Sequence, residues 1–160
     1  MLNIKIISVG DLKEGYLREA CNEYTKRMGT WAKVEHIQLK EERICESPSA
    51  SEIDACLCAE EKRILEKLSP RSYVIAMCVE GKMLSSECFA EKLTQIQNMG
   101  KSEIVFIIGS SHGLSSGVKA RADFKLSISP LTFPHQLLRV ILCEATYRAL
   151  SIINGTKYHK

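Results

Sequence analysis

The segment with the clearest chemical potential is rich in glycine and serine and follows an apolar, strand-like run. It reads Gly-Ser-Ser-His-Gly-Leu-Ser-Ser-Gly over residues 109–117. The pattern is neither the G-x-G-x-x-G of dinucleotide-binding folds nor a P-loop with its Gly-Lys-Ser/Thr end, so the signatures of NAD and nucleoside triphosphate binding are missing. A purely structural interpretation is a tight turn in which the glycines take positive φ angles.

The same segment also fits G-x-S-x-G, the nucleophile elbow of serine hydrolases, through Gly109, Ser111 and Gly113. Asp123 and His135 follow in the chain order that a Ser-Asp-His triad of this kind needs. Only residues 110–160 come after the first glycine, which leaves little room for the remaining strands of such a hydrolase. A small serine hydrolase is therefore kept as an alternative function.

A second unusual segment, Ser127–His135, combines two prolines with apolar side chains where polar loop residues would be expected. A stiff apolar loop beside a glycine-rich loop can form a flat pocket for a purine ring, with backbone groups binding the edge of the ring. Taken alone, the segment fits a connection packed into the core equally well.

Strand-like and helix-like patterns alternate along the chain and predict the elements that must position these two segments. Leu2–Val9 is a near-continuous apolar run, typical of a strand buried on both faces. Further strands are expected at residues 34–39, 73–79, 103–108 and 124–129, with Glu80-Gly81 turning the chain after the third strand. Helices are expected at residues 14–28, 52–68, 86–99 and, with Pro134 at the first helical position, 134–153.

Strands separated by helices predict a single α/β domain over residues 1–160, with a mainly parallel sheet flanked by helices. In such sheets ligands bind beyond the carboxyl ends of the strands. Three segments are expected at that edge: residues 77–81, 109–117 and 129–135.

Charge is distributed unevenly between the two halves of the chain. Residues 1–80 carry 12 Lys and Arg against 14 Asp and Glu, whereas residues 81–160 carry 10 against 5. An anionic partner is therefore expected to meet the second half, because the three strand-end segments lie in that half or at its border.

Composition excludes several classes of protein. With 45% hydrophobic and 26% charged residues, the 160-residue chain is typical of a globular domain, and no apolar run approaches the roughly 20 residues of a membrane span. The N-terminus lacks a signal-peptide pattern, so a cytoplasmic location is expected. The seven cysteines are scattered without a C-x-x-C pair or a zinc-spaced histidine, so we expect reduced thiols and no metal.

Several motifs, in order, resemble one known family. Residues 126–152 contain Leu-Thr-x-Pro-His followed by Leu-x-Arg-Val-x-Leu-x-Glu-x-x-Tyr-Arg-Ala-x-Ser-Ile. Upstream stands Ile-Ile-Gly-x-x-x-Gly-Leu-Ser at residues 107–115, and the chain ends Tyr-His-Lys. Together they resemble the SPOUT-class ribosomal RNA methyltransferases of the RlmH type, over the whole chain.

The resemblance implies a fold, a reaction and partners. The fold is an α/β sheet whose C-terminal part forms a deep trefoil knot, an exception to the rule against knots. The reaction is transfer of a methyl group from S-adenosylmethionine to N3 of a pseudouridine in the helix 69 loop of 23S ribosomal RNA, with assembled ribosomes as substrate. The protein is expected to be a homodimer in which the partner's tail completes each site. A non-catalytic RNA- or nucleotide-binding module is a third hypothesis.

By the same resemblance, the cofactor lies in three knot loops. Met77 matches the first loop and Gly109 the second, and Ile128, Ser129, Pro130, Leu131, Thr132 and Phe133 match the third, which holds adenine and ribose by backbone contacts. The family usually has Gly-Gly at the second loop, where this chain has Gly109-Ser110. We expect Gly109→Val to abolish cofactor binding without loss of the fold, because the new side chain would fill the cofactor's space.

The remaining site residues are assigned from their chemistry. His159 is suited to take the N3 proton and Tyr158 to stack on or orient the base. Lys160, Lys157 and Arg139 are expected to hold phosphates. The tail often ends His-Arg in the family, so Lys160 keeps the charge but loses the bidentate fork. Without the resemblance, residues 158–160 would be an ordinary frayed terminus.

Overall fold

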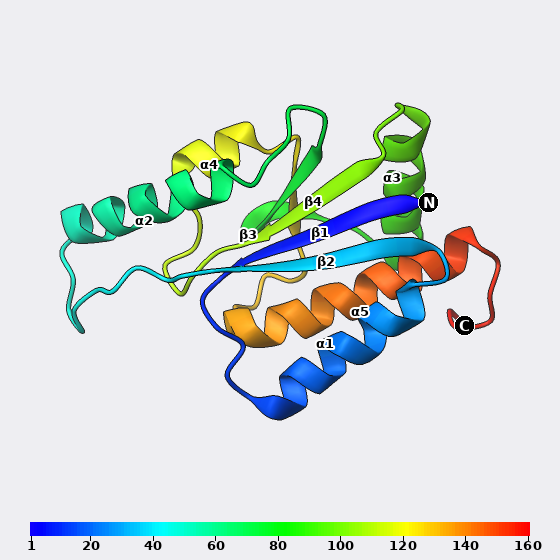
Figure 1. Cartoon of the computed structure of the whole chain (residues 1–160), viewed down its shortest axis with the longest axis horizontal. Helices are drawn as coiled ribbons and strands as arrows, with labels where there is room; N and C mark the ends of the chain where they lie inside the picture. The colour runs from blue at the N-terminus through cyan, green and yellow to red at the C-terminus, as the bar shows by residue number, and fades with distance from the viewer.

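The computed structural model describes all 160 residues and has one five-stranded sheet with helices on both faces (Figure 1). Paired strands are all parallel and lie in the order β2-β1-β4-β3-β5, which confirms the predicted fold class. The strands are β1 (Leu2–Val9), β2 (Ala32–Leu39), β3 (Tyr73–Met83), β4 (Glu103–Ile108) and β5 (Phe124–Ser127). The helices are α1 (Gly15–Met28), α2 (Ala50–Leu65), α3 (Ser86–Asn98), α4 (Ser116–Arg121) and α5 (His135–Ile153).

Two hydrophobic cores fill the two faces of the sheet. The larger core lies under α1, α3 and α5, and the smaller lies under α2 and α4. In β1, Ile4 and Ile6 point into the larger core, whereas Ile7 and Val9 point into the smaller one. Burial of each such side chain stabilises the fold by about 1.5–3 kcal/mol. The continuous apolar pattern of β1 therefore follows from burial on both faces.

Serine caps begin three of the helices. The Ser49 hydroxyl accepts a hydrogen bond from the Glu52 N–H, while the Glu52 carboxylate accepts one from the Ser49 N–H, so a capping box starts α2. The Ser85 hydroxyl caps α3 by accepting a hydrogen bond from the Cys88 N–H. Ser115 does the same for α4, a six-residue helix that the glycine- and serine-rich composition did not predict.

Several predicted boundaries were wrong by a few residues. The cap places the start of α2 at Ala50 and the helix ends at Leu65, not at residues 52 and 68. Strand β2 begins at Ala32 and β5 ends at Ser127. Pro134 has extended backbone angles and is the N-cap of α5, so the helix itself begins at His135.

The predicted turn at Glu80-Gly81 was wrong, because β3 continues to Met83. Both Met77 and Lys82 are register partners of Leu126 in β5, so residues 78–81 form an irregularity within the strand. This excursion is the reason that a turn-like dipeptide occurs inside a strand. A Cβ atom at Gly81 would lie 2.7–2.8 Å from backbone atoms of Lys125 and Leu126, so only glycine allows the two backbones to approach this closely.

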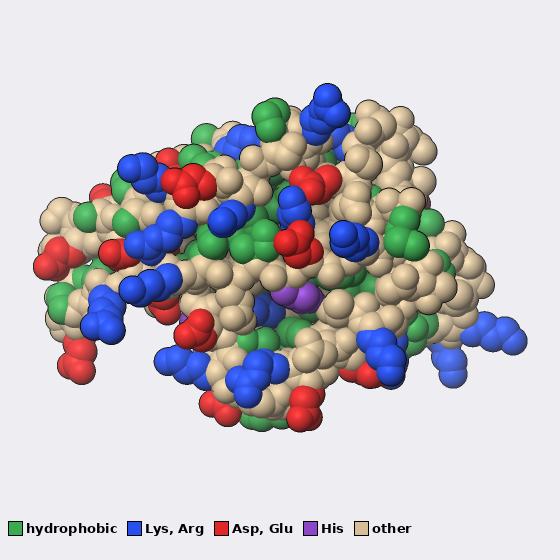
Figure 2. All heavy atoms as spheres, viewed as in Figure 1, with side chains coloured by type: hydrophobic (Ala, Val, Ile, Leu, Met, Phe, Trp, Pro, Cys, Tyr) green, Lys and Arg blue, Asp and Glu red, His purple; other side chains and the backbone are tan.

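The surface carries both signs of charge. On the face drawn in Figure 2, lysine and arginine side chains alternate with acidic ones, and basic side chains project at the end of the molecule that carries the C-terminus. None of the helices combines the length and the apolar content needed to cross a bilayer.

The close approach at Gly81 leads to a stability prediction. Gly81→Ala should lower the free energy of unfolding by about 1–3 kcal/mol, because the added methyl group forces β3 away from β5. Urea denaturation followed by circular dichroism measures the change. Gly15→Ala is the matched control, because a Cβ at this first residue of α1 would meet only the Arg18 side chain, at 3.6 Å. Equal stability of both variants and the unaltered chain would contradict the proposed strand contact.

Candidate active site

One cavity of about 710 Å³ lies at the carboxyl edge of the sheet. It is bounded by the three segments that the sequence analysis placed there: the excursion of β3, the loop after β4 and the loop between β5 and α5. Of the predicted cofactor residues, seven line it and Pro130 does not; the seven are Met77, Gly109, Ile128, Ser129, Leu131, Thr132 and Phe133. The volume lies within the range of about 300–1,000 Å³ that is usual for small-molecule sites.

The loop after β4 is closed on itself. The Gly113 N–H donates to the Ser110 carbonyl oxygen at 2.9 Å, and Gly113 takes a positive φ of 84°. A side chain on Gly109 would overlap the Gly113 carbonyl group and touch Leu114. The expectation that Gly109→Val would fill the cofactor's space is therefore corrected: the added atoms would first deform the loop itself.

The loop between β5 and α5 is shaped by serine hydroxyls as well as by its prolines. The Ser127 hydroxyl donates to the Ser129 carbonyl oxygen at 3.1 Å, and the Ser129 hydroxyl accepts from the Leu131 N–H at 3.0 Å. These local bonds fold the loop around Ile128, which packs against the larger core. Leu131 is 71% exposed although it lines the cavity, so an apolar side chain stands at the rim.

The cavity rim also carries titratable side chains that the sequence analysis did not assign to the cofactor. An ion pair joins Lys119 of α4 to Glu80 of the β3 excursion, and this contact holds the pKa of Glu80 below its usual value. His135 lines the cavity at the start of α5, and burial lowers the pKa of its imidazole. A neutral His135 can accept or donate a hydrogen bond without placing a charge beside a ligand.

Arg139 lies inside the protein, where its side chain is not open to solvent. Its side chain is 2% exposed, and Nη2 donates to the Gly10 carbonyl oxygen at 2.5 Å and, more weakly, to that of Val9 at 3.4 Å. Burial lowers the pKa of the guanidinium group, whose Nε has no hydrogen-bond partner. The arginine thus connects α5 to the end of β1, a structural contact that the sequence analysis missed.

The tail residues are ordered by contacts to their own chain. The Tyr158 ring packs edge-on against Tyr147 at 4.6 Å between centroids, and its hydroxyl donates to Glu144 at 3.0 Å. Burial, together with hydrogen bonding to Tyr24 and Glu144, raises the pKa of Tyr158 to about 12, so the phenol keeps its proton. His159 Nε2 lies 2.7 Å from Glu87 Oε1. The terminus is therefore not an unattached end.

The tail lies at the opposite end of the molecule from the cavity. His135 and Leu138, in the first turn of α5, line the cavity, whereas residues 158–160 follow the last turn. The tail folds back along α5, where Tyr158 bonds to Glu144, and His159 contacts Glu87 of α3; neither glutamate lines the cavity. Figure 1 shows the C-terminus at the same end of the molecule as the N-terminus, opposite the carboxyl ends of the strands. One chain therefore does not bring its own tail to its own cavity.

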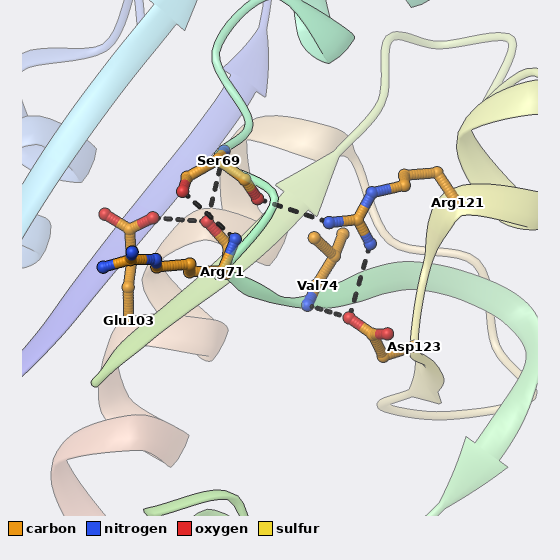
Figure 3. Close-up of polar contacts among 7 residues, drawn as sticks. Ser69, Arg71, Val74, Glu103, Arg121 and Asp123 are labelled. Carbon is orange, nitrogen blue, oxygen red and sulfur yellow. Dashed lines mark hydrogen bonds and ion pairs between the residues drawn. The ribbon is translucent and has the colours of Figure 1, made fainter. Parts of the chain in front are cut away.

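The alternative Ser-Asp-His triad is wrong. Asp123 precedes β5, at the amino edge of the sheet, where its carboxylate accepts the Val74 N–H at 2.8 Å and lies beside Arg121 (Figure 3). Ser111 follows β4 at the carboxyl edge, and its hydroxyl donates to Glu41 at 3.5 Å. Because the strands are parallel, the serine and the aspartate are separated by the length of the sheet. No group of three or more His, Cys, Asp or Glu side chains is arranged to hold a metal ion.

The burial of Arg139 leads to a prediction that separates a structural role from phosphate binding. Arg139→Ala should lower the free energy of unfolding by about 2–4 kcal/mol, because it leaves a void and removes the donors of the Val9 and Gly10 carbonyls. Thermal denaturation measures this effect. A variant with unchanged stability and a weaker salt dependence of RNA binding would instead place the guanidinium group on a phosphate.

Comparisons with known proteins agree with this geometry. A family model described as "Predicted SPOUT methyltransferase" matches residues 2–159. The ribosomal RNA large subunit methyltransferases H of Limosilactobacillus reuteri (strain DSM 20016) and Bacillus pumilus are each 46% identical over 159 residues, which cover 99% of this chain and all of each relative. A protein of Methanococcus maripaludis is 49% identical over the same share. The chain therefore belongs to the SPOUT methyltransferase family.

Proposed function

We propose that this protein methylates N3 of a pseudouridine in the helix 69 loop of 23S ribosomal RNA, using S-adenosylmethionine. The observation that carries the proposal is the cavity at the carboxyl edge of the sheet, formed by the three segments that correspond to the cofactor loops. Full-length relatives named ribosomal RNA large subunit methyltransferase H support the substrate class. Family membership also implies the deep trefoil knot in the C-terminal part of the fold.

The lining of the cavity fits the cofactor. Apolar side chains of Ile128, Leu131 and Phe133 offer a surface for the adenine ring, and the serine-folded loop leaves backbone groups available for its edge. The Gly109 loop bounds the cavity from the carboxyl end of β4. When bound, S-adenosylmethionine supplies an already activated methyl group, so positioning accounts for much of the rate.

The tail supplies the side chains that the cavity lacks. His159 takes the N3 proton, Tyr158 orients the base, and the exposed Lys157 and Lys160 hold phosphates. The contact of Glu87 with His159 keeps the imidazole in one orientation, and the pKa of Glu87 is about 2, so this carboxylate is ionised at neutral pH. Arg139 is reassigned in this proposal: it positions the end of β1 rather than binding RNA.

In a homodimer, the tail of one subunit can meet the cavity of the other. Since the tail of one chain is held by Glu144 and Glu87, which lie outside the cavity lining, the tail that completes a site comes from the partner subunit. Apolar side chains are available for such an interface near the cavity, where Leu131 is 71% and Leu137 38% exposed. We propose that this dimer meets assembled ribosomes in the cytoplasm.

Removal of Tyr158, His159 and Lys160 tests the catalytic assignment. The truncated protein should keep its fold, its mass of near twice 18.0 kDa in light scattering and its cofactor affinity, but should lose methyl transfer. His159→Ala alone should lower the rate by about 10²–10⁴, the usual contribution of a general base.

Single-turnover methyl transfer to purified ribosomes at saturating cofactor measures these rates. Lys67→Ala is the control, because it removes one exposed charge outside the tail and leaves the proton acceptor in place. A truncated protein as fast as the full chain would show that the last three residues are not catalytic.

A mixed dimer tests whether the tail acts on the partner's cavity. One subunit lacks residues 158–160, and the other carries Gly109→Val, which deforms its own cofactor loop. Each homodimer should be inactive, whereas the mixed dimer should regain one intact site and about half of the activity per dimer. Two affinity tags isolate the mixed species before the assay. A mixed dimer as inactive as its parents would contradict a site shared between subunits.

A further inference from the structure

A buried carboxylate lies behind the loop that follows β4, and the proposed reaction does not use it. Glu60 of α2 is 2% exposed. Its oxygens accept hydrogen bonds from neutral donors: the Ser110 hydroxyl at 2.9 Å, the Glu42 N–H at 3.2 Å and the Cys56 thiol at 3.7 Å. A buried carboxylate is costly unless donors of this kind satisfy it.

The bond to Ser110 attaches α2 to the edge of the cavity. Ser110 is 5% exposed, lines the cavity and directly follows Gly109, at the point where the chain leaves β4. A hydrogen bond to a charged acceptor is roughly twice as strong as one between neutral groups. The position of Ser110 is therefore fixed by a residue that does not itself line the cavity.

The hydrogen bond between Glu60 and Ser110 affects the whole loop after β4, because residues 109–113 are bonded and packed to one another. The Gly113 N–H bonds to the carbonyl of Ser110, and the close packing of Gly109 against Gly113 leaves no space for even a methyl group. A displacement of Ser110 would therefore move residues 109–113 together. The same carboxylate binds the backbone of Glu42, so it also connects this loop to the segment after β2.

We infer that Glu60 is a positioning residue for cofactor binding and acts through the Ser110 hydroxyl. This inference rests on the proposed function. Its basis is specific to this chain, because Ser110 stands where the resemblance led us to expect a second glycine, which has no hydroxyl to donate. Compared with glycine, serine at position 110 restricts the backbone but adds a hydrogen bond to the buried Glu60 carboxylate.

The test compares Ser110→Ala, Glu60→Gln, Glu60→Ala and the double variant Glu60→Ala/Ser110→Ala. Calorimetric titration gives the Kd for S-adenosylmethionine, and single-turnover transfer at saturating cofactor gives the rate. Ser110→Ala should raise the Kd about tenfold and leave the saturated rate unchanged, because one hydrogen bond to a charged acceptor is lost. Glu60→Gln should bind S-adenosylmethionine more tightly than Glu60→Ala, since the glutamine amide still bonds to the Ser110 hydroxyl and the Glu42 N–H.

The double variant separates positioning from direct contact. If Glu60 acts through Ser110, the double variant should bind no more weakly than Glu60→Ala alone. Glu66→Gln, at the exposed end of the same helix, is the control and should bind as the unaltered chain does. Ser110→Ala, which removes one oxygen atom, remains informative even if Glu60→Ala fails to fold.

Two results would overturn the inference while leaving the proposed function intact: an unchanged Kd for Ser110→Ala, or fully additive losses in the double variant. An unaltered chain that binds no S-adenosylmethionine would instead overturn the proposed function, and this inference with it.

Discussion

All five strands of the sheet run in the same direction, and the other functional features depend on this constraint. Parallel strands place every carboxyl strand end at one edge, so the excursion of β3 and the loops after β4 and β5 converge there and surround one cavity. The last helix then runs back along the sheet and carries the C-terminus to the other edge. The residues that hold the tail, Glu144 and Glu87, lie outside the lining of this cavity.

Close backbone approach is the second requirement of the fold. At Gly81 the excursion of β3 passes against the backbone of β5, and at Gly109 the loop after β4 folds tightly on itself. Neither glycine has a positive φ, so both are needed for space and not for an unusual backbone conformation. Two buried charged side chains fix the neighbouring segments by hydrogen bonds: Glu60 accepts from the Ser110 hydroxyl, and Arg139 donates to the Gly10 carbonyl oxygen. Residues that do not line the cavity therefore help to determine its shape.

Much of this organisation could be predicted from local patterns. For the strands at residues 2–9 and 103–108, both the first and the last residue were predicted correctly, because burial on both faces makes these strands largely apolar. The three cavity segments followed from the rule for parallel sheets. By contrast, β3 was predicted too short, because its continuation depends on pairing with β5, a partner more than forty residues away in the sequence. Helix α4 was missed because its glycine and serine content favours a loop.

The burial of two charged side chains was not predicted. Arg139 and Glu60 are both 2% exposed. A signal was available for Glu60: it stands four residues from both Cys56 and Ile64 and so continues the buried stripe of α2. For Arg139, the sequence analysis expected a phosphate contact, which requires an exposed guanidinium group. Charge alone does not predict exposure when backbone carbonyls or hydroxyls can satisfy the group.

Hydrogen exchange measured by mass spectrometry, with and without about 1 mM S-adenosylmethionine, tests the central claim most directly, since this concentration is at the upper end of usual Michaelis constants. The account predicts slower exchange in three separate stretches of sequence, residues 77–81, 109–114 and 127–135, because these are the segments that enclose the cavity. Exchange that is unchanged in all three stretches, or slowed only elsewhere, would contradict the assignment of this cavity as the cofactor site.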